Sequence, residues 1–354
     1  MAAVNAAVRD ALREAQVEPL VINVAAPSLD RSLSARLGRL PRVWKGLLTL
    51  ITQRRLQGVS LYMSVSGGFG QLYELAFALL ARLRGMKMFL HHHSFAYLDR
   101  PNLLTRALVR TSGTEAVHVT LSPGMGSHLS QVYGVALVRP VSNAVFFAAV
   151  DAAHTVRKQL RILGFLSNVA PEKGVFEFLD LMQAAQTAGL GMRGRLAGPF
   201  QDAETERVVR ARLQDLPDVE YVGPQYGVDK ATFFLGIDVL IFPTQYVNEA
   251  EPVTVHEVMS HAVPVIAYGR GCIPEIVDAS CGLVIDPGQP FVPAALEQLK
   301  RWLADPVAFE VASREAAACF ADTYSDNQAR WHALLAEMIG SKGAQVGGEE
   351  EKSR

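Results

Sequence analysis

Short strand-like runs alternate with helix-like segments along most of the chain. Segments with apolar residues at helical spacing, such as "GQLYELAFALLARLRG" and "NLLTRALVRTS", separate runs rich in aliphatic and β-branched residues. In the first half these runs predict strands at 20–26, 59–65, 86–93, 116–122 and 135–141. The alternation is typical of βαβ units in a parallel, doubly wound sheet.

The same pattern restarts near residue 158. A strand-like run at 160–167 precedes a predicted helix from about 174 to 188, and further apolar runs follow up to "CGLVIDP". We therefore expect two α/β domains and two C-terminal segments. Their limits are 1–150, 158–325, a helix at 326–339, and a glycine-rich, charged and disordered tail at 340–354.

The first domain departs from the usual order of elements. It begins with the helical segment "VNAAVRDALREAQ", whereas a doubly wound domain normally opens with a strand and a glycine-rich turn that leads into such a helix. We expect this domain to lack its first strand. The pattern is consistent with Met1 being an internal methionine of a longer reading frame.

Composition limits the class of protein. With 34 basic and 35 acidic residues the net charge is near zero, so there is no overall bias toward nucleic acid. Cys272, Cys281 and Cys319 show no C-x-x-C spacing, and we expect free thiols in a reducing cytoplasm. Because no stretch approaches the roughly 18–20 apolar residues that span a bilayer, we expect a cytoplasmic protein, at most peripheral to the membrane.

A predicted helix start lies in the stretch "VLIFPTQYVNEAEPVTVHEVMSHA". Pro252 suits the first helical position, where its missing amide hydrogen is not needed. The amides of Val253, Thr254 and Val255, together with the helix dipole, would then form a site for an anion such as a diphosphate.

Glutamates crowd this helix start. Glu257 lies one turn into the helix, where its carboxylate can accept hydrogen bonds from a pair of hydroxyls, and Glu249 in the loop can reach a second polyol. The arrangement fits a sugar nucleotide, with ribose on one side, diphosphate in the middle and the donated sugar on the other. The alternative is that Glu249 and Glu251 merely stabilise the positive helix end and that Glu257 is solvated.

The longer stretch "EAEPVTVHEVMSHAVPVIAYGRGCIPEIV" resembles the E-x7-E signature of the retaining glycosyltransferases of family 4. Glu249 and Glu257 fall on its two glutamates. The other matching positions are Pro252, Met259, Pro264, Gly271, Pro274 and Glu275. "LGFLSNVAPEKGVFEFLDLM" is similar to the family's first strand and loop of the second domain, with Lys173 on the lysine that contacts the donor diphosphate. The resemblance covers about residues 55 to 340.

The resemblance implies the GT-B fold, in which two Rossmann-like doubly wound domains face a cleft. The second domain would hold the donor and the first the acceptor, and the helix at 326–339 would cross back to the first domain. No D-x-D triplet occurs, and we expect no metal and no other cofactor. Lys173 and the helix amides would balance the charge on the departing diphosphate.

The resemblance further implies transfer of a hexosyl group from a nucleotide-diphosphate sugar, with retention at the anomeric carbon. The acceptor would be a glycan or a lipid-linked sugar, as in surface polysaccharide or glycoconjugate biosynthesis. Glu249 would act on the transferred sugar and Glu257 would hold the ribose. Where the family usually has a second phosphate-binding cation, an arginine, this chain has Phe165, and Asn168 would supply a hydrogen bond without a charge.

Three consecutive histidines end the predicted strand at 86–93. Alternation places His91 and His93 on one face of the sheet and His92 on the other. A zinc site would need further ligands, and no H-E-x-x-H or cysteine is near in sequence. By resemblance, His93 or His91 would contact the transferred sugar; the alternative is a histidine packed at a domain interface.

Two further segments of the first domain are candidate acceptor-side elements. Gly67 and Gly68, between a strand and a helix, could admit a phosphate or a sugar acceptor, although a tight turn alone would explain them. The segment 31–58 is basic and amphipathic, which suits an anionic membrane surface, although an ordinary solvated helix face is the alternative. Its cations are Arg31, Arg36, Arg39, Arg42, Lys45, Arg54 and Arg55.

Two other functions share these features. The phenylalanine at position 165 and the missing N-terminal loop also fit a non-catalytic nucleotide-sugar or glycan binder. A sugar-nucleotide epimerase of the same architecture would form its product without an acceptor. The spacing of Glu249 and Glu257 favours transfer.

Overall fold

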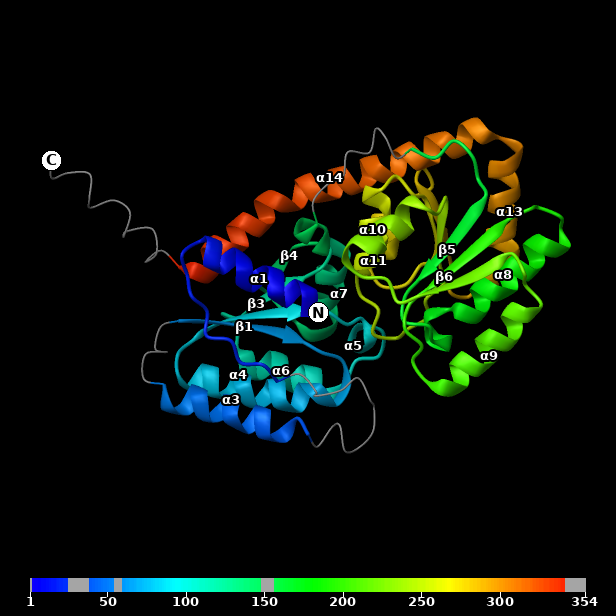
Figure 1. Ribbon diagram of the computed structural model, residues 1–354. Helices are drawn as coiled ribbons and strands as arrows, with labels where there is room; N and C mark the ends of the chain where they lie inside the picture. Colours follow the sequence, from blue (N-terminus) through cyan, green and yellow to red (C-terminus); the bar gives the residue numbers. More distant parts are fainter. Residues whose placement is uncertain (1, 25–37, 54–58, 148–155, 341–354) are drawn as a thin grey trace. The chain divides into compact units, whose positions relative to one another are not determined.

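The computed structural model describes residues 2–24, 38–53, 59–147 and 156–340, and its contacts divide the chain into two compact units (Figure 1). Unit 1 comprises Met1–Val141 and Ala329–Arg354, and unit 2 comprises Ser142–Gln328. The sequence places the corresponding domain limits at 150 and 325. The predicted tail at 340–354 lies outside the described residues except for Gly340.

Unit 1 is built on a parallel sheet of four strands in the order β1-β2-β3-β4. Its strands are β1 (Ser60–Val65), β2 (Lys87–His92), β3 (Val117–Thr120) and β4 (Val138–Pro140). Its helices are α1 (Ala2–Glu14), α3 (Leu40–Thr52), α4 (Gln71–Leu83), α5 (Ala96–Asp99), α6 (Leu103–Ser112) and α7 (Pro123–Tyr133), of which α3, α4 and α6 lie together on one side of the sheet (Figure 1). These strands confirm four of the five predicted for this half.

The predicted strand at 20–26 is wrong for its described part. Residues 17–24 have no regular secondary structure, and 25–26 lie outside the described residues. Leu20 and Val21 are 54% and 59% exposed, whereas Ile22 packs so closely on α3 that a Cβ added at Gly46 would lie 2.6 Å from its Cγ2. The Ile22 side chain of this run thus packs on α3, and the backbone of the described part of the run does not pair with a strand.

The end of the last helix, α14 (Pro306–Ile339), is bonded to the unit 1 sheet. Glu337 accepts from Lys87 Nζ and from Arg139 Nε, each at 3.1 Å. Ser60 Oγ donates to the carbonyl of Met338 at 2.7 Å. These bonds explain why the chain from Ala329 onward groups with unit 1, while the earlier part of the same helix groups with unit 2.

Unit 2 is a six-stranded parallel sheet in the order β10-β9-β8-β5-β6-β7. Its strands are β5 (Ile162–Leu166), β6 (Arg193–Ala197), β7 (Val219–Gly223), β8 (Val239–Phe242), β9 (Val265–Tyr268) and β10 (Gly282–Ile285). Its helices are α8 (Val175–Thr187), α9 (Ala203–Gln214), α10 (Gly227–Leu235), α11 (Val253–Ser260), α12 (Ile273–Ile276), α13 (Phe291–Ala304) and the first part of α14, with 3-10 turns η3 (Asn143–Phe146) and η5 (Pro171–Lys173). The strand predicted at 160–167 is present as β5, and the apolar runs that follow it up to "CGLVIDP" include the other five strands.

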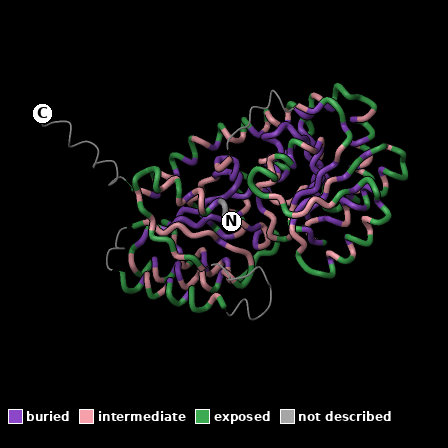
Figure 2. The backbone as a smooth tube through the Cα atoms, in the orientation of Figure 1, coloured by how far each residue is buried: buried purple, intermediate pink, exposed green. Residues whose placement is uncertain are grey.

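The strand order of unit 2 reverses between β5 and β8. From β5 the chain adds β6 and β7 on one side, and then returns to add β8, β9 and β10 on the other. The central strands β5, β8 and β9 are almost wholly buried, whereas the edge strand β7 is mostly partly exposed (Figure 2). In such sheets ligands bind at the carboxyl ends of the two strands where the order reverses. The loops after β5 and β8 are therefore the place to look for a site.

Among the described helices, none is long and apolar enough to cross a membrane.

Candidate functional site

Lys173 and Glu249 meet at the point where the strand order reverses. Lys173 closes η5 after β5, and Glu249 lies in the loop after β8. The Nζ of Lys173 donates to Oε2 of Glu249 at 2.6 Å, and Thr244 Oγ1 donates to the same oxygen at 3.1 Å. Lys173 Nζ also lies 4.3 Å from the centroid of the Tyr246 ring. The fold thus brings together a cation and a carboxylate that are 17% and 12% exposed.

Close backbone packing fixes both loops at this point. Gly174 has a φ of +86°, and a Cβ there would lie 2.3 Å from the carbonyl oxygen of Pro243, at the end of β8. Gly271 has a φ of +60°, and a Cβ there would lie 2.1 Å from the carbonyl oxygen of Ala250 and 2.7 Å from that of Glu249. Only glycine combines this left-handed backbone with so close an approach. The position of Glu249 therefore depends on the glycine at 271.

The turn at 270–272 also holds the Glu249 loop by hydrogen bonds. The Cys272 amide donates to the Ala250 carbonyl at 2.7 Å. Arg270 donates through Nε to Tyr246 O at 3.2 Å and through Nη2 to Val247 O at 2.6 Å. Arg270 and Cys272 thus hold the loop that carries Glu249 in place.

Helix α11 begins one residue later than predicted. Pro252 is its N-cap, with φ −72° and ψ 115°, so its backbone is extended and Val253 is the first helical residue. The amide of Val255 donates to the Pro252 carbonyl at 3.0 Å and is not available to a ligand, contrary to expectation. Within the described residues, no acceptor is recorded for the amides of Val253 and Thr254. Two amides at a helix N-terminus remain for an anion.

Glu257 is paired with Lys230, a residue that the sequence did not single out. The Nζ of Lys230, on α10, donates to Oε2 of Glu257, and the two side chains are 21% and 20% exposed. Both line a pocket of about 170 Å³ whose other walls include Phe147, Phe234 and His261. Lys230 follows Asp229 in the first half of α10, and only the tertiary fold shows that it faces Glu257.

The third glutamate of the loop, Glu251, has a structural role. Its side chain is 2% exposed, and its oxygens accept from Ser142 Oγ at 2.7 Å and from the Asn143 amide at 2.5 Å. His256 Nε2 lies 3.1 Å from Oε1 of the same carboxylate. Glu251 therefore fixes the start of unit 2 to the loop before α11 and is not placed to bind a ligand.

Phe165 and Asn168 lie on different sides of the same segment. Phe165 is fully buried in the unit 2 core, with its ring centroid 5.7 Å from that of Phe178. Asn168 is exposed in the loop after β5. A charged side chain in the orientation of Phe165 would be buried among apolar groups, which is unfavourable. The phosphate contact expected from an arginine at this position is thus absent here, and Asn168 has the accessible side chain.

The three histidines of unit 1 divide between two faces, as predicted. The rings of His91 and His93 lie 4.0 Å apart, and Tyr62 OH lies 2.5 Å from His91 Nδ1. His92 lies on the other face, with its Nε2 2.9 Å from His118 Nδ1. Burial lowers the pKa of His93 to about 3 and that of His91 well below its ordinary value. The imidazole rings of His91 and His93 are therefore neutral near pH 7.

His93 keeps one ring nitrogen for other partners. Its Nε2 is buried and has no hydrogen-bond partner among the described residues, and the same holds for Nε2 of His91. A buried polar atom without a partner is unfavourable and is usually satisfied by water or a ligand. These two atoms are the candidate sugar contacts of unit 1.

The glycines after β1 form a tight turn. Gly68 has a φ of +76° and open space around its α-carbon, and it begins the 3-10 turn Gly68–Gly70. The extended Gly67 precedes it as N-cap. Close by, Ser66 donates through its amide and its hydroxyl to Glu74 Oε1, at 3.0 and 2.5 Å. Burial raises the pKa of Glu74 to about 7, a feature that the sequence did not reveal.

A family model matches one part of the chain. Residues 147–318, which make up most of unit 2, match the family model of the glycosyl transferases group 1. No curated protein matches the chain.

The fold resembles several solved structures. Anabaena Alr3699/HepE in complex with UDP has a TM-score of 0.65 and 16% identity, over 92% of this chain and 88% of that one. Sucrose-phosphate synthase from Thermosynechococcus elongatus has a TM-score of 0.66 and 16% identity, over 90% and 81%. TarM from S. aureus has a TM-score of 0.65 and 13% identity, over 81% and 58%. The chain thus has the GT-B fold, and most of its second unit matches the family model of the glycosyl transferases group 1.

Proposed function

We propose that the protein is a retaining glycosyltransferase that moves a sugar from a nucleotide-diphosphate sugar to an acceptor hydroxyl. The observation that carries this proposal is the Lys173–Glu249 pair at the reversal of strand order, next to the N-terminus of α11. The match of unit 2 to the glycosyl transferases group 1 supports it, as do the UDP complexes among the similar structures.

The diphosphate binds at Lys173 and at the amides of Val253 and Thr254. Lys173 supplies the positive charge, and the dipole of α11 adds to it. With Phe165 in the core, Asn168 contributes a neutral hydrogen bond. Together these groups stabilise the negative charge that develops on the leaving diphosphate, without a metal.

The ribose binds at Glu257, whose carboxylate accepts from its hydroxyls. Lys230 keeps this carboxylate oriented, because their ion pair fixes one carboxylate oxygen and leaves the other for the ligand. The pocket beside the pair is the space available to the nucleoside.

Glu249 acts on the transferred sugar. His93 or His91 is the candidate sugar contact of unit 1. In a retaining transfer the leaving diphosphate oxygen accepts the proton of the acceptor hydroxyl on the same face of the sugar. Glu249 then stabilises the positive charge that develops at the anomeric carbon. A neutral His93 can donate or accept a hydrogen bond at Nε2, according to its tautomer.

The acceptor is a glycan or lipid-linked sugar that approaches unit 1 near Gly67 and Gly68, in surface polysaccharide or glycoconjugate biosynthesis. Helix α3 supports a location on the cytoplasmic face of a membrane. Its buried face is Val43, Gly46 and Leu50, yet it also exposes an apolar stripe. The stripe consists of Leu40, Trp44, Leu48 and Ile51, which are 45%, 65%, 41% and 55% exposed.

Basic side chains accompany this stripe. Arg42 and Lys45 are exposed on α3, and Arg39 is its N-cap. An apolar stripe with flanking cations is typical of helices that lie on anionic lipid. The remaining basic residues of this segment, Arg31, Arg36, Arg54 and Arg55, lie outside the described residues.

The experiment that tests the proposal is a donor screen with the full chain. Wild-type protein and Glu249→Gln are incubated with uridine, guanosine, adenosine and thymidine diphosphate sugars, with and without lipid-linked acceptors, and the released nucleoside diphosphate is measured. We expect acceptor-dependent release from one donor, reduced about 100-fold or more in Glu249→Gln, which still binds the nucleotide. A changed sugar without acceptor would indicate an epimerase, and nucleotide binding without turnover would indicate a binding protein; either result contradicts transfer.

A further inference from the structure

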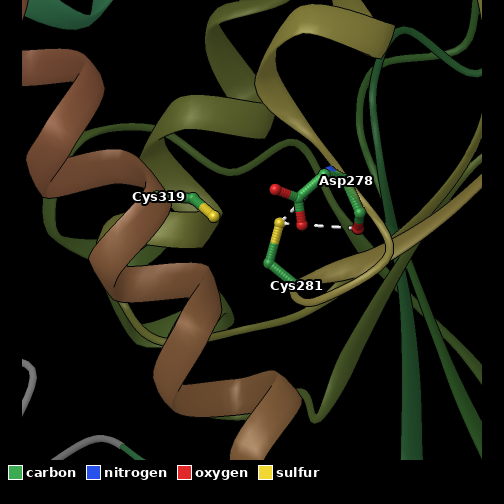
Figure 3. Close-up of side chains that lie close together, drawn as sticks. All are labelled: Asp278, Cys281 and Cys319. Carbon is green, nitrogen blue, oxygen red and sulfur yellow. Dashed lines mark hydrogen bonds between the residues drawn. The ribbon is translucent and has the colours of Figure 1, made fainter.

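Asp278, Cys281 and Cys319 lie close together in unit 2 (Figure 3). One ligand atom from each residue, a carboxylate oxygen and two sulfurs, lies within 4.8 Å of the others. Asp278 and Cys281 belong to the turn between α12 and β10, and Cys319 projects from α14 toward them. The fold thus brings together two cysteines that the sequence predicts to be separate free thiols.

Hydrogen bonds within the turn at 278–281 fix the positions of Asp278 and Cys281. The Asp278 amide donates to Cys281 Sγ at 3.4 Å, and Ser280 donates through its amide and its hydroxyl to Asp278 Oδ1, at 2.8 and 2.5 Å. Cys281 Sγ also donates to the Asp278 carbonyl at 3.7 Å. The thiolate is the form that binds metals, so this thiol must lose its proton when an ion binds.

The ligand set is that of a thiophilic divalent cation. In zinc sites Zn–S is about 2.3 Å and Zn–O about 2.0–2.2 Å, so tetrahedral ligand atoms lie about 3.8 Å or less from one another. Closing this cluster requires the ligand atoms to approach one another by at most about 1 Å, which small rotations of the three side chains can supply. Mg²⁺ and Ca²⁺ prefer oxygen ligands only, whereas two thiolates select zinc.

Burial differs among the three residues. Cys281 is buried, Cys319 is partly exposed and Asp278 is exposed, so the cluster is open to solvent on one side.

We propose that Asp278, Cys281 and Cys319 bind one Zn²⁺, with water in the fourth position. Two thiols lose their protons to solvent as two Zn–S bonds form, and no electron is transferred. The site is structural: it joins α14 to the turn after α12, the segment whose beginning clamps the Glu249 loop through Gly271 and Cys272. The proposal does not depend on the proposed glycosyl transfer.

Zinc content and cobalt spectroscopy test this site. The full chain, reduced and dialysed against chelator, is titrated with Zn²⁺, and separately with Co²⁺ as a spectroscopic probe. We expect one equivalent of either metal, with thiolate-to-cobalt charge-transfer absorption in the near ultraviolet and displacement of Co²⁺ by Zn²⁺.

Variants separate this site from other metal binding. Cys319→Ser and Asp278→Asn should each weaken Zn²⁺ binding by more than about tenfold. Loss of a residue that only hydrogen-bonds to a metal ligand already weakens metal binding by about tenfold or more, so loss of a ligand should cost at least as much. Cys272→Ser, at a buried cysteine outside the cluster, should bind like the wild type. Since Asp278 is exposed, Asp278→Asn tests the site even if a cysteine variant misfolds.

Three results would overturn the proposal. The wild-type chain could bind no Zn²⁺ after reduction, or Cys319→Ser and Asp278→Asn could bind it as tightly as the wild type. Mass spectrometry of the untreated protein could also show a Cys281–Cys319 disulfide that persists in the presence of Zn²⁺. Because none of these readouts uses a sugar donor, they do not bear on the proposed transfer.

Discussion

The Nζ of Lys173 lies 2.6 Å from Oε2 of Glu249, across the ends of the neighbouring strands β5 and β8. An anion that binds Lys173 must therefore compete with Glu249, or form a shared network with it. A diphosphate can do this, because several of its oxygens accept hydrogen bonds. The same pair links donor binding to the residue proposed to act on the sugar.

Removing the Glu257 carboxylate should abolish recognition of the ribose hydroxyls. The wild type is expected to bind a nucleoside diphosphate more tightly than its 2′,3′-dideoxy analogue, by about 1–3 kcal/mol. Glu257→Ala should bind both with the same affinity. Isothermal titration with the four combinations gives the coupling energy. If discrimination survives in Glu257→Ala, another group holds the ribose.

Gly271→Ala should disturb the Glu249 loop as well as stability. Its Cβ would lie 2.1 Å from Ala250 O, in addition to the strain of a φ of +60°. Gly191→Ala is the matched control, since Gly191 has a φ of +64° and no atom within 4 Å of an added Cβ. Both variants should lose about 1–3 kcal/mol of unfolding free energy from backbone strain, and only Gly271→Ala should also lose turnover. Equal turnover in the two variants would show that Gly271 does not position Glu249.

Glu74 should make the stability of the protein pH-dependent. Because its pKa in the folded state, about 7, lies above its ordinary value of 4.5, the folded state binds the proton more tightly than the unfolded chain. The resulting stabilisation is complete below about pH 4.5 and is lost as the pH rises through 7, on the order of 3 kcal/mol in total.

The neutral variant Glu74→Gln tests this dependence. It should be more stable than the wild type at pH 8 and should have a flatter stability profile between pH 5 and 8, measured by urea unfolding. Glu115→Gln, at an exposed glutamate of unit 1, should follow the wild-type profile. Parallel profiles for Glu74→Gln and the wild type would contradict the raised pKa.

The apolar stripe of α3 should bind anionic vesicles. We expect the full chain to sediment with phosphatidylglycerol vesicles at low salt and less at high salt, because the flanking cations are screened. The double variant Trp44→Ser, Leu48→Ser should bind at least about tenfold more weakly, since two apolar side chains no longer enter the lipid. Leu103→Ser, at a residue 82% exposed on α6, is the control. Binding equal to the wild type in the double variant would remove the membrane proposal.

The sequence predicted most strands because each is a short apolar run between helical segments, and this pattern is local. It failed at 20–26, since an apolar run does not show whether its backbone pairs with a neighbouring strand. The sequence pattern also did not predict contacts between residues that are far apart along the chain. Lys230 with Glu257 and Cys281 with Cys319 depend on how whole elements pack.

The site itself was predicted in part. Glu249 and Glu257 stood out as carboxylates beside a predicted helix start, and Lys173 was identified through the family resemblance. Their ion pairs within unit 2 were found only in the structure. Glu251 shows the limit most clearly. In sequence it is one more carboxylate of the cluster, whereas in the fold it is a buried acceptor for Ser142 and Asn143.

The measurement that tests the central claim most directly is nucleotide binding by Lys173→Met, with Lys300→Met at an exposed lysine of α13 as the control. Isothermal titration with uridine, guanosine, adenosine and thymidine diphosphates should identify one that binds the wild type and the control equally well. The same nucleotide should bind Lys173→Met at least about tenfold more weakly, whereas the parent nucleoside should not distinguish the proteins. Equal binding of the diphosphate by Lys173→Met, or no binding of any diphosphate by the wild type, would contradict a donor site at the ends of β5 and β8.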